Sequence, residues 1–170
     1  MQGNLIWITG LAGSGKTTIG KGVYNRLKKE NLNTVFLDGD HFREITGQVS
    51  AHTKEARLDV AFQIARMCKF LTEQGINVVC STISLFKEVH DFNRNNNPRY
   101  YEVYIHCEMG ELIRRDQKNL YSRAIAKEIE NVVGIDIPFD KPLHCNLEID
   151  NTRQDNLNEK INLIINLIKQ

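Results

Sequence analysis

Residues 10–17 read GLAGSGKT, the complete G-x-x-x-x-G-K-[S/T] pattern of a phosphate-binding loop, or P-loop. An apolar run over 5–9 precedes it and a helical pattern over 16–30 follows it, the strand–loop–helix context in which this pattern is credible. Its glycines let successive backbone N–H groups turn inward around phosphate oxygens, and the helix N-terminus adds partial positive charge. The loop therefore predicts a nucleoside triphosphate site and leaves the reaction open.

The last two residues of the loop have distinct expected roles. Lys16 should reach the β- and γ-phosphates of ATP, and Thr17 should offer its hydroxyl to Mg²⁺. Contacts to the donor are expected from the whole segment and from one arginine further along the chain: Gly10, Leu11, Ala12, Gly13, Ser14, Gly15, Lys16, Thr17, Thr18 and Arg115.

Outside the loop, short apolar runs alternate with helical patterns. Strands are expected over 5–9, 34–37, 77–81, 100–106 and 147–149, and helices over 16–30, 54–74, 86–95, 108–116 and 155–168. This alternation predicts an α/β fold with a parallel five-stranded sheet flanked by helices, as one P-loop kinase domain over 1–170. Residues 117–145 fit no regular element and are polar and basic before three turn residues, which is typical of a lid.

Composition narrows the class of protein. The net charge is +1, which argues against a nucleic-acid partner. Neither a membrane-length apolar run nor a signal-peptide pattern is present, so we expect a cytoplasmic protein without membrane association. The widely spaced Cys68, Cys80, Cys107 and Cys145 suggest buried thiols rather than a zinc site or a disulfide framework.

Two carboxylates, Asp38 and Asp40, follow the second expected strand. In an open parallel sheet ligands bind at the carboxyl ends of the strands. Residues i and i+2 of an extended segment share a face, so both side chains could point toward the metal and the acceptor hydroxyl. One could take the acceptor's proton while the other holds Mg²⁺ through water. The alternative is a simple turn built on Asp-Gly-Asp.

Further along, the sequence resembles the adenylylsulfate kinase family. The matching pieces are GLAGSGKTTIGK (10–21), LDGDHFR (37–43), STISLF (81–86), RDQKNLYSRAIAKEIENVVGID (115–136), DKP (140–142) and LEIDNT (147–152), in the family's order through nearly the whole chain. The resemblance implies a P-loop kinase fold with a mobile lid, MgATP as donor, and the ribose 3′-hydroxyl of adenylylsulfate as acceptor. It also implies a homodimer and a small-molecule nucleotide partner.

Residue roles carry over position by position. Asp40 matches the family's catalytic aspartate, the base for the 3′-hydroxyl, which with Lys16 completes the expected catalytic pair. Arg43 and Arg57 match two arginines that grip the phosphosulfate end of the acceptor. Ser84 matches a serine described as a phosphoserine intermediate in some members, although direct in-line transfer needs no covalent step.

The resemblance also places basic residues near the ligands. Lys118 and Arg123 fall in the lid beside the phosphates, and Lys141 matches a basic position near the acceptor. Mg²⁺ is expected at Thr17 and Asp38, directly or through water. The set expected at the acceptor is Asp38, Arg43, His52, Arg57, Val60, Ile83, Ser84, Lys118, Val132 and Lys141.

Departures from the family gather on the side that recognises the acceptor base. His52 and Val132 stand where the family has two phenylalanines that sandwich adenine, and Val60 replaces a base-facing asparagine. Leu85 replaces a proline. Because a stacked base gains roughly 1–3 kcal/mol per contact, these losses predict a 3′-hydroxyl kinase for another nucleotide with a charged 5′ group. The cytidine diphosphoramidate kinase branch, from capsular phosphoramidate pathways, fits best; a diverged adenylylsulfate kinase is the alternative.

Other classes of protein fit less well. A nucleotide-binding regulatory domain without catalysis would need neither Asp40 beside Lys16 nor a long basic segment. A GTPase would carry an N-K-x-D motif, which is missing here, and the strand over 77–81 does not end on an acidic residue. The sequence therefore favours a kinase.

Overall fold

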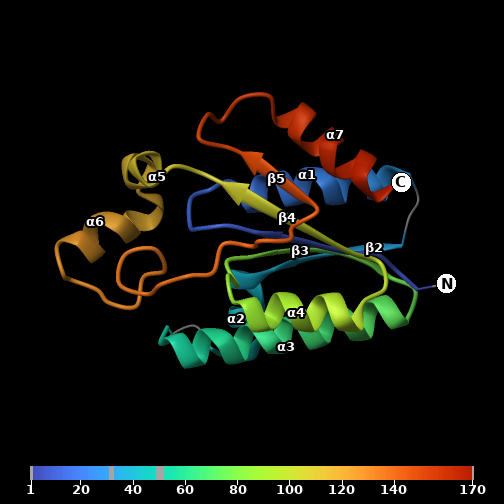
Figure 1. Ribbon diagram of the computed structural model, residues 1–170, viewed down its shortest axis with the longest axis horizontal. Coiled ribbons are helices and arrows are strands. Elements are labelled where there is room, and N and C mark those ends of the chain that lie inside the picture. Colours follow the sequence, from blue (N-terminus) through green and yellow to red (C-terminus); the bar gives the residue numbers. More distant parts are fainter. Residues whose placement is uncertain (1, 31–32, 49–51, 170) are drawn as a thin grey trace.

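A five-stranded parallel sheet forms the centre of the molecule in Figure 1, a computed structural model that describes residues 2–30, 33–48 and 52–169. The strand order is β2-β3-β1-β4-β5. The strands are β1 (Leu5–Thr9), β2 (Thr34–Asp38), β3 (Asn77–Thr82), β4 (Tyr100–His106) and β5 (Leu147–Asp150). Trp7 in the central strand lies opposite Cys80 on one side and Glu102 on the other. The predicted sheet is confirmed.

Helices cover both faces of the sheet. Figure 1 shows α1 (Lys16–Lys29) and α7 (Leu157–Ile168) on one face, and α3 (Lys54–Glu73) and α4 (Lys87–Asn96) on the other. Alternate residues of β1 serve the two layers: Ile6 and Ile8 join the cluster of α1 and α7, whereas Leu5 and Trp7 join the cluster of α3 and α4. Burial on both faces explains why Leu5–Ile8 of β1 form a continuous apolar run rather than an alternating pattern.

A third layer lies beyond the carboxyl ends of the strands. It contains α5 (Met109–Arg115), a short 3₁₀-helix η1 (Gln117–Asn119) and α6 (Leu120–Ile125). Tyr121, Val133 and Ile137 are buried there against Leu85 and Leu112. The expectation that residues 117–145 contain no regular element is therefore wrong. The six-residue α6 gives no readable helical period, because left-handed residues just before η1 (Asp116) and within it (Lys118 and Asn119) interrupt the pattern.

A second difference concerns the acidic pair. Asp38 ends β2 and caps α2 (Gly39–Thr46), since its Oδ1 accepts a hydrogen bond from the backbone N–H of Asp40 at 3.0 Å. Asp40 thus lies in the first turn of a helix. The inference that both carboxylates share one face of an extended segment is wrong, because the cap turns the chain at Gly39.

The ends of the chain lie away from the third layer. Figure 1 shows both termini at the end of the sheet opposite α5 and α6. Gln2 and Lys169 line one shallow depression there, together with Asn77 and Arg99. None of the helices in the described part of the chain is both long enough and apolar enough to cross a membrane.

Candidate active site

A cavity of about 640 Å³ opens at the carboxyl edge of the sheet, between the P-loop, the ends of β2 and β3, and the third layer. It brings together most residues singled out in the sequence. From the donor set these are Ala12, Gly13, Gly15, Lys16, Thr17, Thr18 and Arg115, and from the acceptor and catalytic sets Asp38, Asp40, Arg43, His52, Arg57, Val60, Ile83, Ser84 and Lys118. This edge is where open α/β sheets bind ligands.

The donor end of the cavity is built by the P-loop and the first turn of α1. Lys16 Nζ donates to the backbone oxygen of Leu11 at 3.2 Å. Desolvation lowers the pKa of Lys16 to about 8, although Asp40 and then Asp38 oppose the shift. At pH 7 the Lys16 side chain is therefore still mostly protonated, and its positive charge can bind a phosphate.

Three oxygen atoms meet beside this lysine. Thr17 Oγ1 donates to Asp38 Oδ2 at 3.0 Å and lies 3.3 Å from Ser81 Oγ. Hydroxyl and carboxylate oxygens suit Mg²⁺, which is usually held by one or two carboxylates together with water and substrate phosphates. Within the described residues, no group of three or more His, Cys, Asp or Glu side chains could hold a metal ion. Thr17 and Asp38 thus fit a Mg²⁺ shared with nucleotide phosphates.

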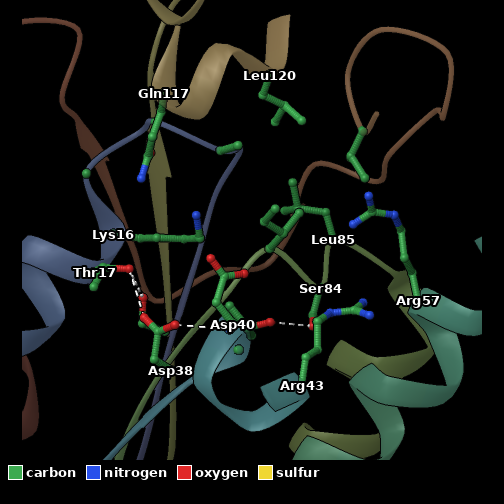
Figure 2. A pocket seen from close by; sticks show the side chains of 18 of the residues that line it. Lys16, Thr17, Asp38, Asp40, Arg43, Arg57, Ser84, Leu85, Gln117 and Leu120 are labelled. Atoms are coloured by element: carbon green, nitrogen blue, oxygen red, sulfur yellow. Dashed lines mark hydrogen bonds between the residues drawn. The ribbon is translucent and has the colours of Figure 1, made fainter. Parts of the chain in front are cut away.

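Asp40 lies between the two ends of the cavity. Figure 2 shows Lys16 and Thr17 on one side of it and the two arginines on the other. Its Oδ2 accepts from Lys118 Nζ at 3.2 Å, and both side chains are more than 70% exposed, at 72% and 73%. An accessible carboxylate in this position can accept a proton from a bound hydroxyl.

Two guanidinium groups mark the acceptor end. Arg43 comes from α2 and Arg57 from the first turn of α3. Arg57 Nε donates to the backbone oxygen of His52 at 2.8 Å, and its Nη2 donates to that of Asn131 at 2.7 Å. Desolvation lowers the pKa of Arg57 and the nearby Arg43 lowers it further, while Asp136 and Asp40 oppose the shift. An anionic ligand between the two guanidinium groups would relieve their repulsion.

His52 stands beside these arginines. Desolvation lowers its pKa, Arg57 and Arg43 lower it further, and Asp40 opposes them. A shift downward from 6.5 leaves the imidazole neutral at pH 7, so it suits stacking or hydrogen bonding to a base rather than anion binding. Val60 is buried in α3 and lines the cavity below. Residues 49–51, which precede His52, lie outside the described residues.

Some expected contacts fall elsewhere. Val132 is absent from the described wall of the cavity and is buried in the third layer; its neighbour Val133 lines the cavity instead. Lys141 lies outside that wall as well, with its Nζ 2.9 Å from Glu148 Oε1 and above the ring of Tyr104. In the P-loop, the same holds for Gly10, Leu11 and Ser14.

Sequence reasoning missed part of the wall. The additional residues are Gly39, Ile64, Ser81, Thr82, Leu85, Phe86, Gln117, Leu120, Val133 and Gln154. The apolar ones among them give the acceptor end a hydrophobic surface. The resemblance to the family had marked Leu85 only as a substitution, whereas Leu120 and Val133 belong to a segment whose fold the sequence did not indicate.

The loop that carries Ser84 is held from behind by a buried network. Ser84 Oγ lies 2.8 Å from Thr82 Oγ1, and the backbone oxygen of Ser84 lies 2.9 Å from His90 Nε2. His90 Nδ1 lies 3.3 Å from the buried Glu102, which also pairs with Arg94. His90 showed no metal-ligand spacing in the sequence, and the structure places it in this network instead.

Comparison with known proteins agrees with this geometry. The model of the adenylylsulphate kinase family matches residues 2–150. A cytidine diphosphoramidate kinase of Campylobacter jejuni is 53% identical over 161 residues, which span 95% of this chain and 94% of that protein. A probable adenylyl-sulfate kinase of Aeropyrum pernix is 33% identical, covering 99% and 93% of the two chains.

A solved structure is similar over the whole length. The Mycobacterium tuberculosis APS kinase, determined in complex with AMPPNP and APS, superposes with a TM-score of 0.91 at 26% identity and 99% coverage of both chains. The likeness thus extends from the sequence to the arrangement of the whole fold.

Proposed function

The chain belongs to the adenylylsulfate kinase family, whose members are ATP-dependent phosphotransferases, and we propose that it phosphorylates the ribose 3′-hydroxyl of cytidine diphosphoramidate. The observation that carries the proposal is that Arg43, Arg57, His52 and Val60 line one cavity, with the pKa of His52 lowered. By the family resemblance, His52 and Val60 stand at the positions of a phenylalanine and an asparagine that contact adenine. A charged 5′ group is still bound, whereas the aromatic surface for a purine is reduced. The 53% identity to a cytidine diphosphoramidate kinase supports the same acceptor.

The proposed reaction follows the layout of the cavity. The P-loop and Lys16 bind the β- and γ-phosphates of ATP, and the arginines bind the 5′ end of the acceptor. Asp40 takes the proton from the 3′-hydroxyl as that oxygen attacks the γ-phosphorus. The new O–P bond forms while the bond to the β,γ-bridging oxygen breaks, and ADP leaves. Ser84 lines the cavity without a covalent role.

Two positively charged lysines stabilise the negative charge on the phosphoryl group during its transfer. Lys16 belongs to the P-loop, and Lys118 of η1 lies 3.2 Å from Asp40. We propose that Mg²⁺ binds at Thr17 and Asp38, where it neutralises charge on the phosphate oxygens. Arg115 is assigned to the donor side. Val132 and Lys141 do not line the described wall, and we assign them no direct contact with the acceptor.

Further parts of the proposal concern the protein as a whole. We propose a cytoplasmic homodimer in which residues 1–170 form one kinase domain with a lid at about 117–145. Analytical ultracentrifugation at micromolar concentration should give twice the chain mass of 19.6 kDa. A single species at the chain mass would contradict the dimer.

The identity of the acceptor is tested by comparing two candidate acceptors in separate assays. The purified enzyme is given MgATP with either cytidine diphosphoramidate or adenylylsulfate, and ADP formation is followed at several acceptor concentrations. We expect kcat/KM for the cytidine compound to exceed that for adenylylsulfate by at least about tenfold, the loss expected for one missing stacking contact. A 3′-deoxy cytidine analogue is the control, since it should give no product. A higher kcat/KM for adenylylsulfate would overturn the proposal.

Adenylylsulfate is the second candidate, because both arginines are present and the M. tuberculosis APS kinase superposes closely. The same experiment separates these two readings from a regulatory domain that only holds nucleotide. ADP formation that depends on either acceptor would exclude the regulatory domain.

A further inference from the structure

Three successive carbonyl groups of the P-loop are each held by a side chain behind the loop. Tyr121 Oη donates to the backbone oxygen of Ala12 at 2.8 Å. Arg115 Nη1 donates to that of Gly13 at 2.9 Å, and Asn151 Nδ2 donates to that of Ser14 at 2.7 Å. The three donors come from α6, from the end of α5 and from the residue after β5. These bonds fix the orientation of the peptide groups that should bind phosphate.

Arg115 donates one of these bonds and directs its other N–H groups to neighbouring parts of the fold. Besides Gly13, its Nη2 donates to the backbone oxygens of Asn151 and Thr152, both at 2.8 Å, and its Nε pairs with Glu111 at 2.9 Å. The side chain is only 8% exposed. The arginine expected at ATP therefore lines the cavity while its N–H groups bind backbone oxygens and Glu111.

The orientation of the Asn151 amide is set by Lys160, a buried lysine on α7. Lys160 Nζ donates to Asn151 Oδ1 and to the backbone oxygen of Arg153, both at 2.8 Å, and lies 3.4 Å from Asp155 Oδ1. An ammonium group can only donate, so it requires the amide oxygen on its own side. The NH₂ group of Asn151 then faces Ser14. Three acceptors meet the three protons of an ammonium group that would otherwise be costly to bury.

Asn151 also explains why residue 15 of the loop is glycine. Gly15 has a φ of +95°, and a Cβ there would collide with Asn151 Nδ2. Asn151 thus packs directly against the peptide that precedes Lys16. The side chain supports the loop both by its hydrogen bond and by contact.

We propose that Lys160 is a positioning residue for the donor phosphates: acting through Asn151, it holds the Ser14 carbonyl outward so that the P-loop is arranged for phosphate before ATP arrives. Lys160 touches no substrate in this scheme. Preorganised donors strengthen binding because no free energy is spent on ordering them at the moment of binding. The proposal shares one assumption with the proposed function, namely that ATP binds at the P-loop. It does not depend on the identity of the acceptor.

The main test replaces Lys160 by methionine, which keeps the length of the side chain and removes its donors. Titration calorimetry should show the Kd for MgADP raised about tenfold, as for the loss of a charge-assisted hydrogen bond. The KM for the acceptor should change less than about twofold, since the arginines are remote from Lys160. Lys160→Arg should restore most of the affinity, because a guanidinium group also only donates.

Two further variants keep the test decisive. The Asn151→Asp variant retains a partner for Lys160 but cannot donate a hydrogen bond to Ser14. It should therefore fold, and it should bind MgADP more weakly than the wild type does. Lys169→Met is the matched control, since Lys169 is exposed and pairs only with Glu30 in the described chain, at 3.0 Å. If Lys160→Met lowers the melting temperature but leaves the Kd for MgADP within about twofold of wild type, the role is structural and the proposal is wrong. Should Lys160→Met fail to fold, wild-type affinity in Asn151→Asp would overturn it.

The binding measurement uses no acceptor. Failure to phosphorylate the cytidine compound would therefore leave this test intact, and an unchanged Kd for MgADP would leave the acceptor proposal intact.

Discussion

Asp40 and Lys118 form an ion pair at 3.2 Å in the wall of the cavity, and both side chains are exposed. Because water reaches the pair freely, the ion pair itself adds little to stability. Its placement matters more: the carboxylate stands between the phosphate end and the arginine end of the cavity, and Lys118 lines the same cavity. Residues near this point should thus change the rate more than the binding of ATP.

Replacing Asp40 by alanine tests this placement. We expect kcat to fall about 10²–10⁴-fold, as for the loss of a general base, while the Kd for MgADP stays close to that of wild type. Steady-state kinetics and calorimetry measure the two quantities. Asp59→Ala, an exposed carboxylate on α3, is the control and should leave both unchanged. Activity within a few-fold of wild type would show that the base is another group.

Lys16 should make donor binding depend on pH. Its pKa is about 8 in the protein alone, and bound phosphates should raise that pKa, so the complex should hold more protons than the free enzyme above pH 8. At pH 8.5 we expect MgADP binding to take up a substantial fraction of one proton, and at pH 7 far less. Calorimetry in two buffers of different ionisation enthalpy measures the uptake. Lys16→Arg should remove it; equal uptake in that variant would point to another titrating group.

At the scale of elements, the strands and long helices could be predicted because each carries its own pattern. The apolar run of β1 and the helical spacing of α3 are local signals, and the P-loop between β1 and α1 is fixed by its residue types. The acidic turn was misread because one capping bond at Asp38 starts α2. In the third layer, α5 was predicted, whereas α6 was missed because Tyr121 is buried in a cluster that includes distant residues such as Leu11 and Tyr104. Tertiary contacts of that kind leave no period in the sequence.

Arg57 joins two elements that the sequence treated separately. Its guanidinium group ties the segment before α3 to the segment after α6, through the backbone oxygens of His52 and Asn131. Arg57→Ala should raise the acceptor KM by at least about tenfold, through loss of a charged contact, and leave the KM for ATP within about twofold. Initial rates with each substrate varied in turn measure both. Arg66→Ala, an exposed arginine on the same helix, is the control. An equal rise in both KM values would mean that Arg57 serves the fold or the donor instead.

At the scale of the whole molecule, one buried polar network links the sheet to the layer of α3 and α4. Glu102 on β4 is 1% exposed and is paired with His90 and Arg94, both on α4. A carboxylate so far from water depends on both partners, and removing one leaves the charge incompletely paired. The same network holds the backbone of Ser84 at the cavity, so the stability of the fold and the shape of the site are connected there.

His90→Ala should therefore destabilise the entire fold. We expect a loss of about 1–3 kcal/mol in the free energy of unfolding, the cost of leaving buried polar groups without their partner, and a melting temperature lower by several degrees. Urea and thermal melts followed by circular dichroism measure this. Lys87→Ala, which removes an exposed pair on the same helix, should melt close to wild type. If His90→Ala melted with the control, the network would be dispensable for stability.

Figure 1 shows both ends of the chain at the end of the sheet opposite α5 and α6, whereas residues at the end of α5 and the start of α6 line the cavity. An attachment made through either terminus would therefore leave the substrate entrance facing outward. The protein should tolerate coupling to a bead, a sensor surface or a second enzyme with little loss of turnover, whereas attachment through α5 or α6 would place the support over the entrance. For preparative synthesis of a phosphorylated nucleotide, the enzyme should be immobilised through one of its termini.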